Sequence, residues 1–201
     1  SPPQLRRVIE HRMTLDGVQY DGITFKDQWG LVRAGRRHDV KRQLGYKLKA
    51  LLSYRAALPN GAKWWLFGDD VEADAETFRL FGRVCAGLRG DELDARLSDA
   101  EVHRQDKIEI HALLHDLPVG EDPVEAIVIR CTRGVLPQYT EDRIYPCLSF
   151  LQAALLAFDR GLIKQDDVWP VLRDVRRRGL SNAETAHHRD DAVKRFGLNL
   201  E

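Results

Sequence analysis

The sequence predicts a mixed α/β fold: a mostly parallel sheet followed by a C-terminal series of helices. Two short apolar runs, 64–67 and 124–129, are typical of strands buried on both faces of a parallel sheet. Segments with helical periodicity alternate with these runs, as in α/β proteins. After residue 134 only helical patterns follow. We therefore expect an α/β region over residues 1–133 and a helical region over 134–201 that packs on it.

The spacing of apolar residues predicts the first elements. A helix is expected over 2–14, because its two prolines suit a first helical turn and apolar residues then recur at helical intervals. A weak strand is expected around 18–25. The second part of the basic segment 33–49 predicts another helix, which the turn residues at 59–61 would end.

The central elements follow the first apolar run, which predicts a strand over 64–67. A helix is expected from Asp74. The spacing of Ser98 and Glu101 matches a capping box and predicts a helix that continues to about Asp116. The second apolar run, 124–129, predicts another strand of the same sheet.

Three helices are expected in the C-terminal region. The first has Ile144, Leu148 and Leu151 on one face, and the second lies around 168–175. Ser181, with an acid three residues later, predicts a capped start for the third.

Composition excludes several classes of protein. The 201 residues carry 31 basic and 31 acidic side chains, so the formal net charge is zero, which argues against a general nucleic-acid-binding protein. No apolar stretch approaches the roughly 18–20 residues that span a bilayer, so no transmembrane segment is expected. The three cysteines form no closely spaced pair, which favours reduced thiols in a cytoplasmic protein.

The segment 68–74, Gly-Asp-Asp-Val-Glu-Ala-Asp, is the strongest chemical signal. It places four carboxylates directly after a predicted buried strand. Clustered carboxylates repel each other, and a hard cation such as Mg²⁺ would relieve this repulsion. We therefore predict a magnesium site with Asp69, Asp70 and Asp74 as the candidate ligands. The alternative is that the acids only cap the next helix.

Cations precede this acidic turn in the sequence. Residues 31–50 hold seven cations and one acid, whereas residues 69–101 hold ten acids and four cations. A cation beside metal-binding carboxylates suits phosphate chemistry, because it holds the anion while the metal neutralises developing charge. Lys47, 22 positions before Asp69, is our candidate for this role. The arginines at 36 and 37 are interpreted as solvated surface.

Three features in this order resemble the haloacid dehalogenase (HAD) superfamily of phosphatases. Ser1 and the two prolines after it look like the end of the second motif of that family. Lys47 is similar to the third-motif lysine, and Gly68-Asp69 with Asp74 to the fourth motif. Together with Phe25-Lys26-Asp27, these residues resemble a phosphatidate-phosphatase-like catalytic domain.

The resemblance implies a HAD-like Rossmannoid sheet and a Mg²⁺-dependent phosphohydrolase that forms an aspartyl-phosphate. It implies that Lys47 steadies the phosphoryl group, that Ser1 is the second-motif serine and that Asp69 binds Mg²⁺, with Asp70 or Asp74 orienting the ion or its water. The first motif of the family, Asp-x-Asp, does not occur in the 201 residues. We therefore expect the C-terminal part of a longer chain, with the nucleophile upstream and no activity in these residues alone.

Two other functions stay open at this point. The chain could be a HAD-like binding or scaffold module that has lost catalysis, or an unrelated α/β protein whose acidic turn binds Ca²⁺ or nothing. If it is a phosphatase, its phosphorylated substrate could be a phospholipid, a small molecule or a phosphoprotein. The sequence does not indicate an oligomeric state.

Overall fold

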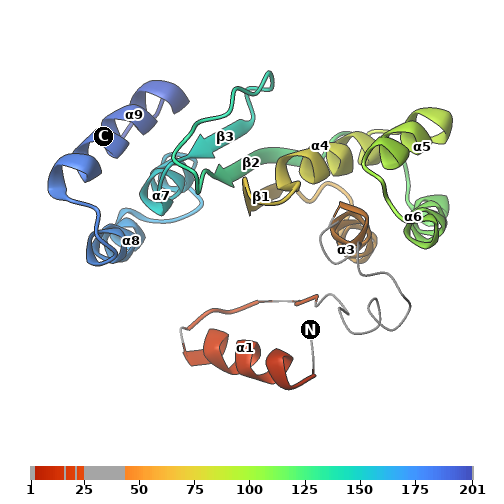
Figure 1. The fold of residues 1–201 in the computed structure, drawn as a ribbon, viewed down its shortest axis with the longest axis horizontal. Coiled ribbons are helices and arrows are strands. Elements are labelled where there is room, and N and C mark those ends of the chain that lie inside the picture. The colour runs from red at the N-terminus through yellow and green to blue at the C-terminus, as the bar shows by residue number, and fades with distance from the viewer. Residues whose placement is uncertain (1–2, 16, 21, 25–43, 201) are drawn as a thin grey trace. The chain divides into compact units, whose positions relative to one another are not determined.

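The computed structural model describes residues 3–15, 17–20, 22–24 and 44–200 (Figure 1). By their contacts the residues group into two compact units. The first unit comprises Ser1–Asn60 and Leu80–Asp122, as far as these are described, and the second comprises Gly61–Arg79 and Pro123–Glu201. Ser1 and the segment 25–43, which includes Phe25-Lys26-Asp27 and the arginines at 36 and 37, lie outside the described residues.

Helices form the first unit. They are α1 (Pro3–Leu15), α3 (Leu44–Ala57), the second half of α4 (Asp74–Cys85), α5 (Gly90–Asp99) and α6 (Arg104–Asp116). Helix α3 packs against α6 and buries Leu48 and Leu52 completely. The two helices approach closely at Gly45, where a Cβ atom would lie 3.2 Å from the Cβ of Asp106 in α6 and 2.8 Å from the side chain of Val102, which precedes α6. Lys49 adds ion pairs to two acids of α6.

A three-stranded parallel sheet lies in the second unit. Its strands are β1 (Trp64–Asp69), β2 (Val124–Arg130) and β3 (Ile144–Cys147), in the spatial order β1-β2-β3. The last residues of the three strands are Cα partners: Asp69 with Arg130, and Arg130 with Cys147. The carboxyl ends of the strands therefore meet at one edge, which is where open α/β sheets bind ligands.

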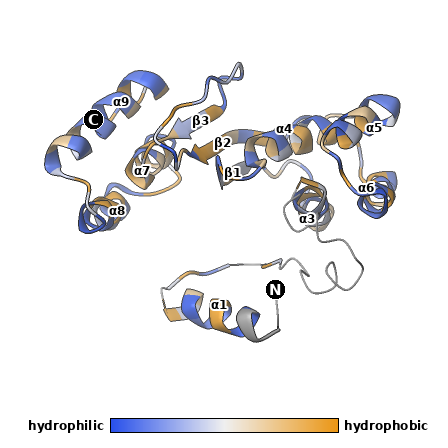
Figure 2. Ribbon diagram, viewed as in Figure 1, coloured by the Kyte–Doolittle hydropathy of each residue, from blue (hydrophilic) through white to orange (hydrophobic). Residues whose placement is uncertain are grey.

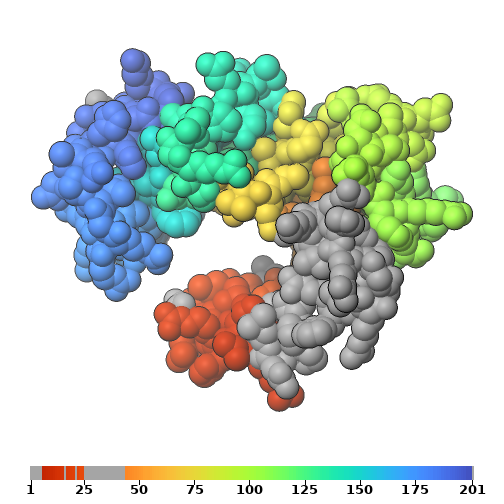
Figure 3. All heavy atoms as spheres, in the orientation of Figure 1, coloured from red at the N-terminus to blue at the C-terminus, as the bar shows by residue number. Residues whose placement is uncertain are grey.

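Helices α7 (Phe150–Asp159), α8 (Gln165–Arg177) and α9 (Asn182–Phe196) complete the second unit. Helix α7 packs against both α8 and α9 and also contacts β3 (Figure 1). Figure 2 shows that β2 is largely hydrophobic, and Figure 3 shows the outer surface of α8 and α9 in blue. One cluster of buried core residues in this unit comprises Val128, Cys147, Leu151, Leu155, Leu156, Val175, Ala192, Phe196 and Leu198.

The structure confirms a mixed α/β fold with a parallel sheet, and most of the predicted elements. Helices are present near 2–14 and from Asp74, strands at both apolar runs, and a helix around 168–175. The predicted cap of the last helix is also present: the Ser181 N–H donates to Glu184 at 2.8 Å, and the Glu184 N–H donates to the Ser181 hydroxyl at 3.2 Å. Among the described residues, no helix combines the length and the apolar character needed to cross a membrane.

The prediction of a helix from Ile144 is wrong. Residues Ile144–Cys147 form β3, and the helix begins only at Phe150. The apolar residues of this segment suit both structures, and pairing with β2 decides in favour of the strand. The expected boundary at residue 133 falls inside the second unit.

The prediction of a capping box at Ser98 is also wrong. Ser98 lies within α5, which is an unpredicted helix, and its hydroxyl donates to the carbonyl of Asp94. The next helix begins at Arg104 after a turn in which Glu101 has a φ of 52°. His103 caps it, because its ring nitrogen accepts from the Gln105 N–H. A serine hydroxyl can bond back to its own helix as well as cap one, so the motif is ambiguous.

Two strand predictions need correction. The residues described within 18–25 are not in a strand. The strand over 64–67 is present, but it is not buried on both faces. Only Leu66 is buried, and Phe67 is 55% exposed. Within the described residues β1 is an edge strand with one neighbour, which reduces the burial of its side chains.

Candidate functional site

The acidic turn begins where β1 ends, at the carboxyl edge of the sheet. Gly68 is essential to its shape: a Cβ atom there would lie 2.4 Å from Oδ2 and 2.5 Å from Cβ of Asp74, closer than atoms can approach. The Asp69 N–H donates to Asp74 Oδ2 at 3.0 Å. The Gly-Asp pair followed by Asp74 thus forms a closed turn in which the glycine makes room for a buried carboxylate.

Asp69 is partly exposed and uses only one of its oxygens in this turn. Its Oδ1 accepts hydrogen bonds from the Val71 N–H at 2.9 Å and the Glu72 N–H at 3.3 Å. Its Oδ2 makes no hydrogen bond to any described residue. This oxygen is therefore available for a cation or for water.

Asp70 joins the end of β1 to the end of β2. Its Oδ1 accepts hydrogen bonds from the hydroxyl of Thr132 at 2.6 Å and from the Thr132 N–H at 2.8 Å. The Asp70 N–H in turn donates to the carbonyl of Arg130 at 3.1 Å. The hydrogen bonds from Thr132 lower the pKa of the Asp70 carboxyl. Asp70 thus has a structural role in the strand ends.

Asp74 is the first residue of α4 and is only 6% exposed. A carboxylate at a helix N-terminus interacts favourably with the helix dipole. An acid at the start of a helix, the alternative to a metal ligand, is thus present at Asp74. The role of Asp74 in orienting a metal ion or its water stays a prediction.

Arg130 and Thr132, which were not among the predicted site residues, also lie at this edge. The Arg130 guanidinium donates to the carbonyl oxygens of Cys131, at 2.9 Å, and Leu148, and it lies 5.4 Å from the centre of the Phe150 ring. Its Cα is the partner of Asp69 in the sheet. In the sequence, the position of Arg130 and Thr132 directly after the apolar run 124–129 could have indicated that they lie at this edge.

Lys47 lies on α3 in the first unit and is partly buried, whereas the three aspartates of the acidic turn belong to the second unit. Its role beside Asp69 therefore stays a prediction based on sequence spacing. Ser1 lies outside the described residues, so its role is also still a prediction.

The donor set of the turn fits a hard cation with few protein ligands. Among the described residues, no three His, Cys, Asp or Glu side chains are grouped as a ready-made metal site. Mg²⁺ does not need such a group, because it keeps several waters and is usually held by one or two carboxylates. The open Oδ2 of Asp69 can supply one such oxygen. Mg²⁺ as the cofactor stays a prediction.

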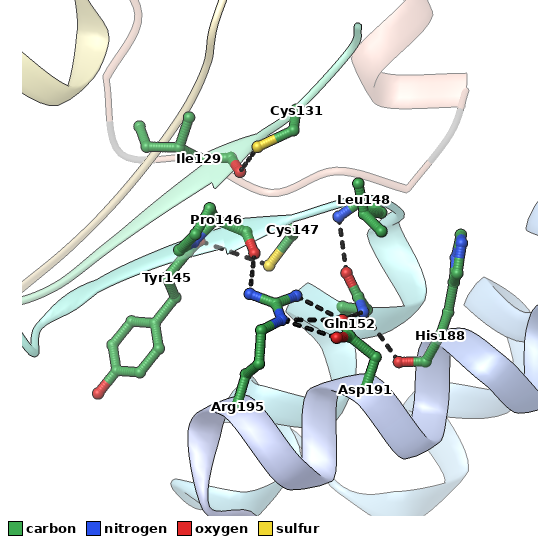
Figure 4. A network of polar contacts seen from close by, with 10 residues as sticks. All are labelled: Ile129, Cys131, Tyr145, Pro146, Cys147, Leu148, Gln152, His188, Asp191 and Arg195. Atoms are coloured by element: carbon green, nitrogen blue, oxygen red, sulfur yellow. Dashed lines mark hydrogen bonds and ion pairs between the residues drawn. The ribbon is translucent and has the colours of Figure 1, made fainter. Parts of the chain in front are cut away.

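A buried polar network lies behind β3 (Figure 4). Gln152 of α7 is completely buried; its Oε1 accepts from the Leu148 N–H at 2.6 Å, and its Nε2 donates to Asp191 at 2.7 Å. Arg195 of α9 bonds to Asp191 and donates to the carbonyl of Pro146 at 2.8 Å. Each of these groups has partners, so the network serves to hold α7 and α9 to the end of the sheet.

The cysteines near this network are not activated. All three cysteines of the chain are buried. Burial raises the pKa of Cys147 to about 12 and that of Cys85 to about 11, and it also raises the pKa of Cys131. Reactive cysteines have lowered pKa values, so the structure gives no support for a cysteine nucleophile.

Comparisons with protein-family models, with curated proteins and with solved structures found no significant match.

Proposed function

We propose that this chain carries the metal-binding part of a Mg²⁺-dependent phosphohydrolase of the HAD type. The observation that supports the proposal best is the closed turn after β1. Gly68 leaves room for Asp74, Asp74 accepts the backbone N–H of Asp69, and Asp69 retains one oxygen without a hydrogen bond to the described residues. The turn lies at the carboxyl edge of a parallel sheet, where such folds bind substrates.

The proposal assigns a role to each candidate residue. Asp69 would bind Mg²⁺ through Oδ2, and Asp74 would hold the turn and orient metal-bound water. Asp70 would keep the ends of β1 and β2 together through Thr132. When bound, the ion would neutralise charge on a phosphoryl group. Lys47 and Ser1 would contact the phosphoryl oxygens.

Catalysis also needs a nucleophile that this sequence does not show. The HAD mechanism uses an aspartate from an Asp-x-Asp motif, and the 201 residues contain no such motif. We therefore propose that the 201 residues alone are inactive and that a segment carrying this aspartate completes the site. The substrate would be a phosphate monoester, whether on a phospholipid, a small molecule or a protein.

A non-catalytic binding or scaffold module is the second candidate. One observation favours it: each of the three aspartates of the turn accepts a hydrogen bond within the protein through one of its oxygens. Such a turn could persist for its structural value after catalysis had been lost.

Calorimetric titration with Mg²⁺ tests the metal site. We expect weak binding that Asp69→Asn abolishes, because the substitution removes the charged oxygen that a hard cation prefers. Asp99→Asn is the matched control, because this residue ends α5 in the first unit and makes the same change of charge. Equal binding by the Asp69→Asn and Asp99→Asn variants would exclude Asp69 as the ligand.

Activity tests the rest of the proposal. A chain that includes the nucleophile should hydrolyse p-nitrophenyl phosphate with Mg²⁺, and Lys47→Ala should reduce its turnover by roughly 10²-fold or more. Mg²⁺ binding at Asp69 without hydrolysis would instead support the binding module.

A further inference from the structure

A cavity lies among the three C-terminal helices of the second unit, separate from the acidic turn. Its volume is about 380 Å³, within the range of small-molecule sites. None of the residues that line it belongs to segment 68–74 or to the strands. Most of the lining residues are apolar, and most of these apolar residues come from α7 and α8: Leu151, Leu155, Phe158, Val168, Trp169 and Leu172.

Trp169 marks the open side of this cavity. It is 55% exposed, although large aromatic side chains are usually more fully covered in a folded protein. Val168 and Leu172 lie beside it and are partly buried against the core of the unit. The cavity thus has an apolar floor that is continuous with the core and an apolar wall that is accessible from solvent.

The charged groups of the cavity have one sign. Arg176, in the last turn of α8, and Arg189 of α9 both line it, and no carboxylate does. Arg189 pairs with its neighbour Asp190 at 2.7 Å. The structure shows no hydrogen bond or ion pair of the Arg176 side chain to any described residue. An apolar space whose lining includes two arginines is complementary to a molecule with an apolar chain and an anionic head.

We infer that this cavity binds a small amphiphile that consists of one medium-length alkyl chain and a carboxylate. The chain lies against the leucines and Trp169, and the carboxylate contacts Arg176 and Arg189. Guanidinium groups bind carboxylates with two parallel hydrogen bonds, which gives both energy and orientation. The cavity volume favours such a small molecule over a helix of a partner protein. This inference does not depend on the proposed phosphohydrolase activity.

Calorimetric titration of the 201-residue chain with decanoate, below its micellar concentration, tests the site. We expect saturable binding with one decanoate per chain. Ala186→Trp should abolish it, because Ala186 lines the cavity from α9 and is exposed, so the larger side chain can occupy the space without disturbing the core. Trp169→Ala is a second variant that should weaken binding, since this side chain is more than half exposed and contributes little to folding.

The contribution of the head group needs its own comparison. Replacing both Arg176 and Arg189 by Gln should weaken decanoate binding about tenfold or more, which is the effect of losing one charge-assisted hydrogen bond. Replacing both Arg173 and Arg177 by Gln is the matched control, because it also removes two positive charges, at positions of α8 outside the lining, and should leave binding unchanged. Decan-1-ol should bind the original chain more weakly than decanoate does.

Several results would overturn the inference. Decanoate binding that is equal in the Ala186→Trp variant would place the ligand elsewhere. Equal affinity for decanoate and decan-1-ol, unaffected by the arginine changes, would refute recognition of the anionic head. Sedimentation equilibrium that shows a dimer which Ala186→Trp disrupts, together with no decanoate binding, would assign the cavity to a second copy of the chain.

Discussion

The close contact at Gly68 allows a direct test of the turn. In a Gly68→Ala variant the new methyl group would lie 2.5 Å from Cβ and 2.4 Å from Oδ2 of Asp74, which is only 6% exposed. The strand end or the start of α4 must shift to relieve this overlap. Overpacking of this kind costs about 1–3 kcal/mol. For a chain of this length, each kcal/mol lowers the melting temperature by about 2–4 °C, so we expect a decrease of about 2–12 °C.

Thermal unfolding followed by circular dichroism measures this effect. Gly120→Ala is the matched control, because no atom lies within 4 Å of a Cβ at that position and its φ is not positive. It should leave stability within about 0.5 kcal/mol. Adding Gly68→Ala to an Asp74→Gly variant should cost little more than Asp74→Gly alone, because the overlap is then removed. If Gly68→Ala is as stable as Gly120→Ala, the steric reasoning about the turn is refuted.

Three further predictions concern the second unit and the thiols. Thr132→Val should make the free energy of unfolding less sensitive to acid. Hydrogen bonds from Thr132 lower the folded-state pKa of Asp70, so the stability that Asp70 contributes is present above its unfolded-state pKa and is lost as the pH falls through its folded-state pKa. Urea unfolding between pH 2 and 6 should therefore show a smaller loss of stability in the variant than in the original chain. Gln152→Met should destabilise the chain by about 1–3 kcal/mol in urea unfolding, since it leaves buried partners without hydrogen bonds; stability equal to that of the original chain would contradict the network in Figure 4. At pH 8, Cys85 and Cys147 should react with a thiol reagent only after denaturant is added, because burial keeps them protonated, and rapid labelling of the native chain would show that they are accessible.

Local patterns predicted those parts of the fold that local chemistry decides. The Ser181 and Glu184 cap is formed by residues three positions apart, and the structure shows the predicted hydrogen bonds. The apolar run 124–129 became the central strand because it can be buried on both faces. The acidic turn could also be predicted from local sequence, because Gly68, Asp69 and Asp74 lie within seven residues and contact one another.

Long-range contacts decided the remainder. The segment Ile144–Cys147 has apolar residues that suit either a helix or a strand, and only the hydrogen bonds to β2 select the strand. In the sequence, Asp70 is one of several neighbouring acids, and its hydrogen-bond partner Thr132 lies 62 positions away. Sequence spacing alone could not identify that pair, or Arg130 beside Asp69.

By itself, the sequence determined the class of the fold, the position of the acidic turn and the oxygen chemistry of its side chains, because periodicity, glycine and carboxylates act over a few residues. Only the tertiary structure decided which carboxylate oxygen is left without a hydrogen bond, which acid joins two strands, and that α7, α8 and α9 leave a cavity with two arginines in its lining. The physical reason is that the partner and the burial of a side chain depend on segments that are distant in sequence and adjacent only after folding.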